Sequence, residues 1–329
     1  MKPIFALATM PRGSRHVFQA DRGTLMTRFL TRRILSAILT LFVIITFTFF
    51  LMRMVPGGPF NSEKMNAVTK ANMEKKYGLD KPVIQQFGIY LTELAKGDLG
   101  PSLKMKGRSV NSIIAEKFPV SARLGAMALI TAVILGITLG IAAAIKHESL
   151  LDRMVMLLTT IGISVPGFVM GTLFLILFGV VLQISPTTWE NTPANYILPV
   201  ITYSFYPTCY VTKLTRSSML ETLGQDYIKT ARAKGLSNVV VDFKHALKNS
   251  IIPVITYLGP LTAYLITGGF AVEKIFSVPG LGRFFIDSIS NRDYPLIMGT
   301  TIFLAVLVIG INVIVDILYT FVDPRIKLQ

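Results

Sequence analysis

Six long stretches without a charged side chain constrain this fold more than any other feature of the sequence. Each contains 18 to 29 residues, and about 20 mostly apolar residues cross a bilayer as a helix. Lipid offers backbone polar groups no other partner, so each stretch is expected to be helical. The sequence therefore predicts an all-α, polytopic membrane protein with six transmembrane helices. The predicted spans are 34–51, 124–145, 154–182, 191–212, 249–272 and 294–315.

Composition and charge agree with a membrane protein. Hydrophobic residues make up 52% of the chain and charged residues 16%, against about 25% charged residues in an ordinary soluble domain. The formal net charge is +15, but nucleic-acid binders gather Lys and Arg on one polar face. Here the basic residues lie between the apolar stretches. We therefore expect membrane lipid around the chain and no nucleic acid.

The distribution of basic residues predicts which side of the membrane each loop faces. Arg28, Arg32 and Arg33 precede the first stretch, and seven Lys and Arg residues lie between the fourth and fifth stretches. Short basic loops stay in the cytoplasm, so both termini are expected there. The basic segment 56–118 must then lie outside, which its length allows, because loops longer than about 60 residues are translocated largely regardless of charge.

Residues 1–25 differ from the rest of the chain. They are polar and basic, and Met26 could begin the protein, so we expect a disordered tail or an upstream start codon. Residues 26–329 form one membrane domain. Its external segment 56–118 contains one amphipathic helical stretch, in which four apolar residues recur at helical spacing. These residues are Val83, Phe87, Leu91 and Leu94.

The sequence contains no recognisable catalytic, nucleotide-binding or metal-binding motif, so no enzyme activity, metal or cofactor is expected. His16, His147 and His245 are too scattered for a ligand set. The two alternatives, a self-powered secondary transporter or channel and a membrane enzyme, would need ionisable or catalytic pairs within the spans, and none occurs. A transporter built this way would need energy from a partner. Arg123 and Asp316, at span edges, are interpreted as structural.

The segment 219–250 is patterned as two helices joined by a tight turn. Asp226 suits a helix start, Gly235 can take a positive φ and end that helix, and Ser237 or Asn238 can cap the next. Leu220, Leu223, Tyr227 and Ala231 form one apolar stripe, and Val239, Phe243 and Ala246 form a second apolar face. Lys229, Arg232 and Lys234 could meet a soluble partner, or the whole segment could lie on anionic lipid headgroups.

This segment resembles the EAA loop of binding-protein-dependent ABC permeases. The similar residues are Asp226-Tyr-Ile-Lys-Thr-Ala-Arg-Ala-Lys-Gly-Leu-Ser237, His245-Ala-Leu-Lys-Asn249 and Pro253. Lys229-Thr230-Ala231 occupies the Glu-Ala-Ala positions, and Gly235 is the glycine that follows. The family's first Glu and first Ala are replaced here, and so are its later Ile and Pro. The peptide-transport branch has the same replacements, and its proline comes a few residues later, as at Pro253.

The resemblance extends from about Met26 to the C-terminus through further segments. These are Arg53-Met-Val-Pro-Gly-Gly-Pro-Phe60, Gly97-Asp-Leu-Gly-Pro-Ser102, Phe118-Pro-Val-Ser-Ala-Arg-Leu124, Ser277-Val-Pro-Gly-Leu-Gly-Arg283, Asn291-Arg-Asp-Tyr294 and Asp323-Pro-Arg-Ile326. Together they are similar to the B-type permease subunit of an oligopeptide transporter. A dipeptide or nickel permease is the alternative, because sister systems share most of these segments.

The resemblance implies a type I ABC importer fold in the bacterial cytoplasmic (inner) membrane. It implies four kinds of partner: membrane lipid, a second homologous permease subunit, two cytoplasmic ABC ATPase subunits and an extracytoplasmic peptide-binding protein. The segment 219–250 would be the coupling loop that docks on an ATPase. The coupling residues it implies are Lys229, Thr230, Ala231, Arg232, Gly235, Leu236 and Ser237. The residues that contact the substrate are not assigned by the sequence.

Overall fold

The computed structural model describes residues 12–54, 75 and 78–322. Within these residues the chain is helical, with no strand and one isolated antiparallel bridge between Pro101 and Ser109. The all-α prediction is therefore confirmed. The last residues of the segment that resembles the family, 323–326, and residues 1–11 lie outside this description.

Four of the six predicted spans are long, apolar helical segments in the described part of the chain. They are Thr31–Met54 in α2 (Arg12–Met54), Val110–Ile145 (α5), Ile252–Ile275, which joins α12 (Ile252–Ile266) to α13 (Phe270–Ile275), and Tyr294–Leu318 in α15 (Tyr294–Val322). A bent helix pair raises the number to at most five. The predicted count of six is therefore not confirmed by length and hydropathy.

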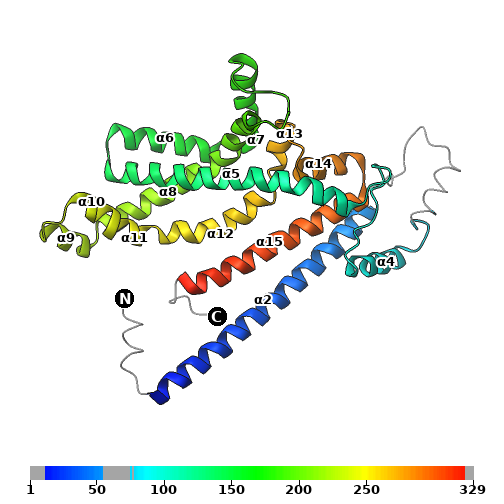
Figure 1. The fold of residues 1–329 in the computed structure, drawn as a ribbon, viewed down its shortest axis with the longest axis horizontal. Coiled ribbons are helices and arrows are strands. Elements are labelled where there is room, and N and C mark those ends of the chain that lie inside the picture. The colour runs from blue at the N-terminus through cyan, green and yellow to red at the C-terminus, as the bar shows by residue number, and fades with distance from the viewer. Residues whose placement is uncertain (1–11, 55–74, 76–77, 323–329) are drawn as a thin grey trace.

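The third predicted span, 154–182, is not one straight helix. It consists of α6 (Leu150–Ser164), α7 (Gly167–Phe174) and the π-helix η1 (Leu175–Val181), and its two halves meet at 110°. Proline has no N–H to donate and disfavours helical geometry in the residue before it. Val165, before Pro166, accordingly takes extended angles of −86° and 127°. Figure 1 shows α7 turning away from the direction of α6.

The fourth predicted span corresponds to α8 (Pro193–Leu223), the most enclosed helix of the protein. It packs against α5, α6 and α12, which run beside it in Figure 1. Its buried side chains include Asn195, Thr202, Ser204, Thr212 and Thr215. Because neighbouring helices rather than lipid cover these polar groups, α8 can be more polar than a lipid-exposed span.

Glycines allow α5 and α8 to approach closely. A Cβ added at Gly136 would lie 2.7 Å from Val211, and one at Gly140 would lie 2.5 Å from Thr215 and 2.8 Å from the carbonyl oxygen of Thr212. Small residues at helix contacts are typical of membrane proteins, because they let two backbones pack together.

Replacing Gly140 by alanine is therefore expected to force α5 and α8 apart. Overpacking of this kind costs about 1–3 kcal/mol, so the thermal unfolding midpoint of the detergent-solubilised protein should fall. Gly310→Ala on α15 is the control, because nothing lies within 4 Å of a Cβ there. Equal midpoints for the two variants would contradict the close α5–α8 contact.

Helices α2 and α15 run side by side and form a separate arm in Figure 1. Arg33 and Asp316 form an ion pair at 2.8 Å between them, which supports the structural interpretation of Asp316. Arg123 is exposed on α5. Residues 12–25, expected to be part of a tail, belong to the helix α2.

Short helices gather at the two ends of the molecule. The helices α9 (Asp226–Ala233), α10 (Asn238–Val240), η2 (Val241–Ala246) and α11 (Leu247–Ser250) lie at one end. The helices α4 (Val83–Ala95), α13 and α14 (Leu281–Asn291) lie at the other (Figure 1). The start of α2 and the end of α15 point toward the end that carries α9, so the two sets of short helices fall on opposite sides of the spans.

Candidate functional site

The coupling loop predicted at 219–250 is a helix–turn–helix in the structure. Helix α9 begins at Asp226, whose carboxylate pairs with Lys229 at 2.9 Å. Gly235 follows the helix with a φ of 78°, a conformation that glycine adopts without the penalty of a side chain. Ser237 is extended and begins the next helix at Asn238. The positive φ predicted for Gly235 is therefore confirmed, whereas Asp226 is the first residue of α9 rather than its cap, and Ser237 occupies the N-cap position of α10 without a side-chain capping hydrogen bond.

The apolar faces predicted for this loop are only partly the buried ones. Ile228 and Val241 are fully buried, together with Met219, Ala231 and Ala246, and they form a small core under the loop with Ala144 of α5. Tyr227, Val239 and Phe243, predicted to lie on the apolar faces, are instead 43%, 67% and 52% exposed. Residues Val241–Ala246 are a π-helix, whose wider turn defeats spacing rules based on 3.6 residues per turn.

Most of the predicted coupling residues lie on the outer side of the loop. Ala231 is buried in the small core, and the other six are exposed: Lys229, Thr230, Arg232, Gly235, Leu236 and Ser237. Thr230 donates to the carbonyl oxygen of Asp226 at 3.0 Å. We call these exposed residues, with Tyr227, Lys234, Val239 and Phe243, the coupling surface. It combines apolar side chains with basic ones at one end of the molecule.

The loop is fixed to the spans by contacts that the sequence analysis missed. Arg216 of α8 pairs with Asp152 of α6 through two hydrogen bonds, Nε to Oδ1 at 2.6 Å and a terminal nitrogen to Oδ2 at 2.8 Å. The Asn249 side chain donates to the hydroxyl of Tyr227 at 2.8 Å. Because α8 leads directly into α9, these contacts hold the coupling surface rigidly to the helices that enclose it.

The outer end contains a fully buried carboxylate, which the sequence analysis also missed. Glu273 of α13 is fully buried, and its Oε2 accepts a hydrogen bond from the backbone N–H of Arg283 at 3.0 Å. Ser121 of α5 accepts one from the N–H of Leu281 at 2.8 Å. The segment between the fifth and sixth predicted spans is thus a compact helical hairpin held against α5.

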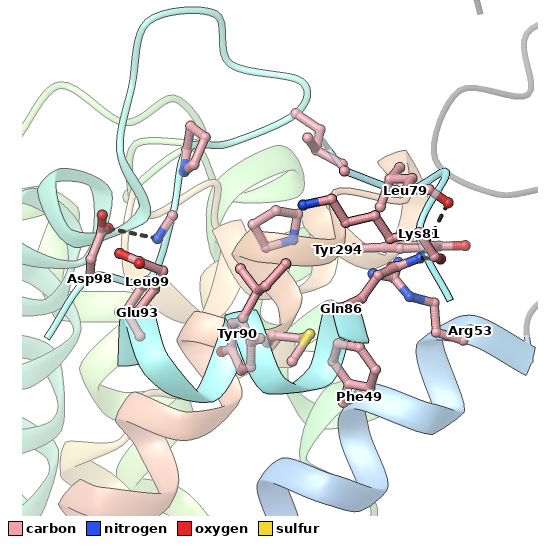
Figure 2. Close-up of a pocket in the computed structure, with 17 residues that line it drawn as sticks. Phe49, Arg53, Leu79, Lys81, Gln86, Tyr90, Glu93, Asp98, Leu99 and Tyr294 are labelled. Carbon is pink, nitrogen blue, oxygen red and sulfur yellow. Dashed lines mark hydrogen bonds between the residues drawn. The ribbon is translucent and has the colours of Figure 1, made fainter. Parts of the chain in front are cut away.

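A cavity of about 280 Å³ lies at the outer end between α2, α4 and α15. Figure 2 shows Arg53 of α2, Tyr90 of α4 and Tyr294 of α15 around it. Phe87 packs on Phe49 with ring centroids 5.0 Å apart, so the predicted amphipathic helix docks on the spans. Tyr90 lies outside the spans, and its burial raises the pKa of the hydroxyl.

A larger cavity, of about 660 Å³, lies within the helix bundle. Its walls come from the break between α6 and α7, from α8, and from the break between α12 and α13. No charged side chain lines it among the described residues. The sequence analysis assigned no substrate-contacting residues, and the segments that line this cavity are up to about a hundred residues apart in the chain.

The described fold defines a polytopic helical membrane protein with a helix–turn–helix exposed at one end. Residues 136–328 match the family described as binding-protein-dependent transport system inner membrane component. Residues 26–125 match the N-terminal region of such membrane components. The chain belongs to this family of inner membrane transport components, which confirms the family recognised from the EAA-type loop.

Curated relatives cover nearly the whole chain. The dipeptide transport system permease protein of Bacillus subtilis is 45% identical over 305 residues, which are 92% of this chain and 99% of the relative. The oligopeptide transport system permease proteins of Haemophilus influenzae and Escherichia coli K12 are 43% and 42% identical over 305 residues, covering 92% of this chain and all of each relative.

Proposed function

We propose that this chain is a permease subunit of an ATP-driven importer that translocates peptides across the cytoplasmic membrane. Membership of the binding-protein-dependent family supports transport. The relatives are dipeptide and oligopeptide transport system permease proteins, which supports peptides as the substrate class. The chain has no catalytic role in this proposal, and separate ATPase subunits hydrolyse the ATP.

The coupling surface is the observation that carries the proposal. Its apolar members Leu236, Val239 and Phe243 are 39%, 67% and 52% exposed, and basic side chains surround them. A rigid helix–turn–helix with this composition suits insertion into a groove of a soluble ATPase. The alternative, an amphipathic loop on lipid headgroups, does not require the small core that packs the loop against Ala144 of α5.

In the proposed complex this chain pairs with a second, homologous permease subunit, and two ATPases dock below. A peptide-binding protein delivers the substrate at the outer end, where α4, α13 and α14 lie. Both termini are then cytoplasmic, on the side of the coupling surface. Helix α8, which corresponds to the fourth predicted span, brings the number of spans to six. ATP binds one conformation of the ATPases better than the other, and this differential affinity shifts the permease between inward- and outward-open states.

We further propose oligopeptides rather than dipeptides as the main substrate, on the basis of residues 97–102 and 118–124. Dipeptide and oligopeptide permeases are nearly equally similar to this chain, at 45% and 43% identity. Competition between dialanine and penta-alanine for uptake by the reconstituted transporter tests the choice. Stronger competition by dialanine would favour a dipeptide permease, and competition by nickel alone would favour a nickel permease.

Gly235→Arg is expected to abolish peptide-stimulated ATP hydrolysis by the reconstituted complex. The new side chain stands on the coupling surface, at a φ of 78° that only glycine adopts easily, with nothing within 4 Å of the new Cβ. Its effect should therefore fall on docking rather than on packing within the chain. Copurification of the ATPase subunits and ATP hydrolysis with and without penta-alanine are the measurements.

Gly107→Arg is the matched control for this variant. Gly107 has a φ of 77° and equally open surroundings, but it lies in the outer segment. The control should keep its ATPase subunits. Normal docking and stimulation in Gly235→Arg would show that this loop does not couple the chain to an ATPase, and uptake of peptide without any ATPase would overturn the ABC function altogether.

A further inference from the structure

Four tyrosines lie along neighbouring sides of α8 and α12. Tyr206 and Tyr210 belong to α8, and Tyr257 and Tyr264 belong to α12. The ring centroids of Tyr206 and Tyr210 are 6.3 Å apart, and those of Tyr210 and Tyr257 are 4.4 Å apart. Tyr264 lines the same cavity as Tyr206. We call this continuous aromatic surface, distant from the coupling surface, the tyrosine strip.

The exposure of the tyrosine strip is unusual for a surface within the spans. Tyr206, Tyr210 and Tyr264 are 41%, 37% and 60% exposed, and none of the four hydroxyls has a hydrogen-bond partner among the described residues. Tyrosines on lipid-facing surfaces are enriched at the membrane interfaces. Because an unpaired hydroxyl in hydrocarbon is costly, the strip is suited to face a polar partner or water rather than lipid.

The strip leads into the 660 Å³ cavity, which Tyr206 and Tyr264 also line. Two interruptions of helical backbone meet there, at Pro166 between α6 and α7 and at Gly268 between α12 and α13. Non-helical backbone at membrane depth is tolerated where protein covers it or where it lines a water-filled cavity. The volume falls within the range of about 300–1,000 Å³ that ligand pockets occupy.

We propose that the tyrosine strip and this cavity bind the substrate during passage, by contacting the main chain of an extended peptide. This assignment rests on the proposed peptide-import function. A tyrosine hydroxyl both donates and accepts, so it can pair with either a peptide N–H or a peptide C=O. The rings offer apolar surface to any side chain, and the lining, which has no charged residue, favours neither sign of charge over the other. The site therefore reads the peptide backbone and tolerates different side chains.

The alternative occupant of this face is the second permease subunit. A helix packed on the strip would cover the tyrosine rings, but it would have to fill or leave empty a cavity of about 660 Å³. Close-packed protein contacts contain few voids larger than a water molecule. The hollow shape therefore favours a mobile substrate with its water over a permanent helix contact.

Thiol labelling by a reactive peptide tests the location of the path. The complex would carry Cys209→Ala with a single cysteine at Tyr210→Cys or Tyr264→Cys. Ile130→Cys and Ile314→Cys, both at positions 58% exposed on the spans α5 and α15, are the controls. Bromoacetylated penta-alanine, added to the assembled complex in proteoliposomes with the binding protein and ATP, should label the two strip positions and spare the controls.

Equal labelling at strip and control positions would overturn the assignment. So would strip cysteines that react only with a cysteine of the second permease under a short bifunctional crosslinker and never with the peptide, because the strip would then be a subunit interface.

Removal of the hydroxyls tests the proposed chemistry without removing the rings. The triple variant Tyr206→Phe, Tyr210→Phe, Tyr264→Phe should lower the rate of penta-alanine uptake about tenfold, since one hydrogen bond is worth roughly a two- to tenfold change in an equilibrium constant. Copurification of the other subunits and hydrolysis of ATP without peptide should be unchanged. Tyr90→Phe, at the outer end, is the control and should transport normally.

Different results would overturn the import function and the assignment of the tyrosine strip. If the wild-type complex shows no ATP-dependent peptide uptake, the proposed import function fails. If the wild-type complex transports penta-alanine and the triple variant transports it equally fast, only the assignment of the tyrosine strip is overturned.

Discussion

Asp152→Ala is expected to lower the free energy of unfolding by about 3 kcal/mol, near the lower end of the range for breaking a buried ion pair. The variant leaves the Arg216 guanidinium without its carboxylate between α6 and α8. The side chains of Arg216 and Asp152 are 18% and 4% exposed, so water compensates the guanidinium only in part. The thermal unfolding midpoint of the solubilised protein should fall by several degrees, and coupling of ATP hydrolysis to peptide should weaken with it.

Two further variants separate the charge effect from the general effect of a substitution. Removing both charges, as in Asp152→Leu with Arg216→Met, should restore most of the lost stability, because no unmatched charge remains. Glu93→Ala breaks the exposed Lys96–Glu93 pair, whose side chains are 63% and 43% exposed, and should cost less than about 1 kcal/mol. If the double variant were as unstable as Asp152→Ala, the unmatched charge of Arg216 would not be the cause of the lost stability.

Hydropathy predicted four spans that are long apolar helical segments among the described residues, and it left the predicted spans 154–182 and 191–212 unconfirmed. The predicted spans 34–51, 124–145 and 294–315 fall within long apolar helical segments, and 249–272 overlaps most of a fourth, Ile252–Ile275. The helix α8 contains many buried polar side chains, so its apolar content does not reveal its position. The bend at Pro166 was signalled by Pro-Gly, but the angle of 110° depends on packing that no local pattern contains.

For the candidate site, the sequence predicted where the turn lies but not which side chains of the two helices are buried. Gly235 and Ser237 mark a helix end and a helix start through backbone chemistry, which acts over a few residues. The buried positions Ile228 and Val241 depend on how the loop meets α5 and α8. The pair Arg216–Asp152 and the tyrosine strip join residues that are 64 and about 50 positions apart in the chain, and no periodicity in one sequence relates such residues.

The second large expected effect on stability concerns Glu273, in the hairpin of α13 and α14 at the outer end. The carboxylate of Glu273 is surrounded by glycines, and a Cβ at Gly268, Gly280 or Gly282 would lie 2.9, 2.5 or 2.9 Å from its oxygens. Glu273 thus fills a space that these glycines and the side chain of Ser121 line. Its Oε2 satisfies the N–H of Arg283, while Ser121 satisfies that of Leu281, and together they join the hairpin to α5.

Glu273→Ala is expected to cost about 3 kcal/mol or more, because it leaves a void and a buried N–H without its acceptor. Glu273→Gln keeps the shape and one carbonyl oxygen that can accept from Arg283, so it should lose far less. The measurements are the thermal unfolding midpoint and the protection of the Arg283 amide against hydrogen exchange. If Glu273→Gln and Glu273→Ala were equally damaging, shape and acceptor would not explain the role of Glu273. If instead both variants kept a protected Arg283 amide and a normal midpoint, the hairpin would be held to α5 by Ser121 and apolar packing alone.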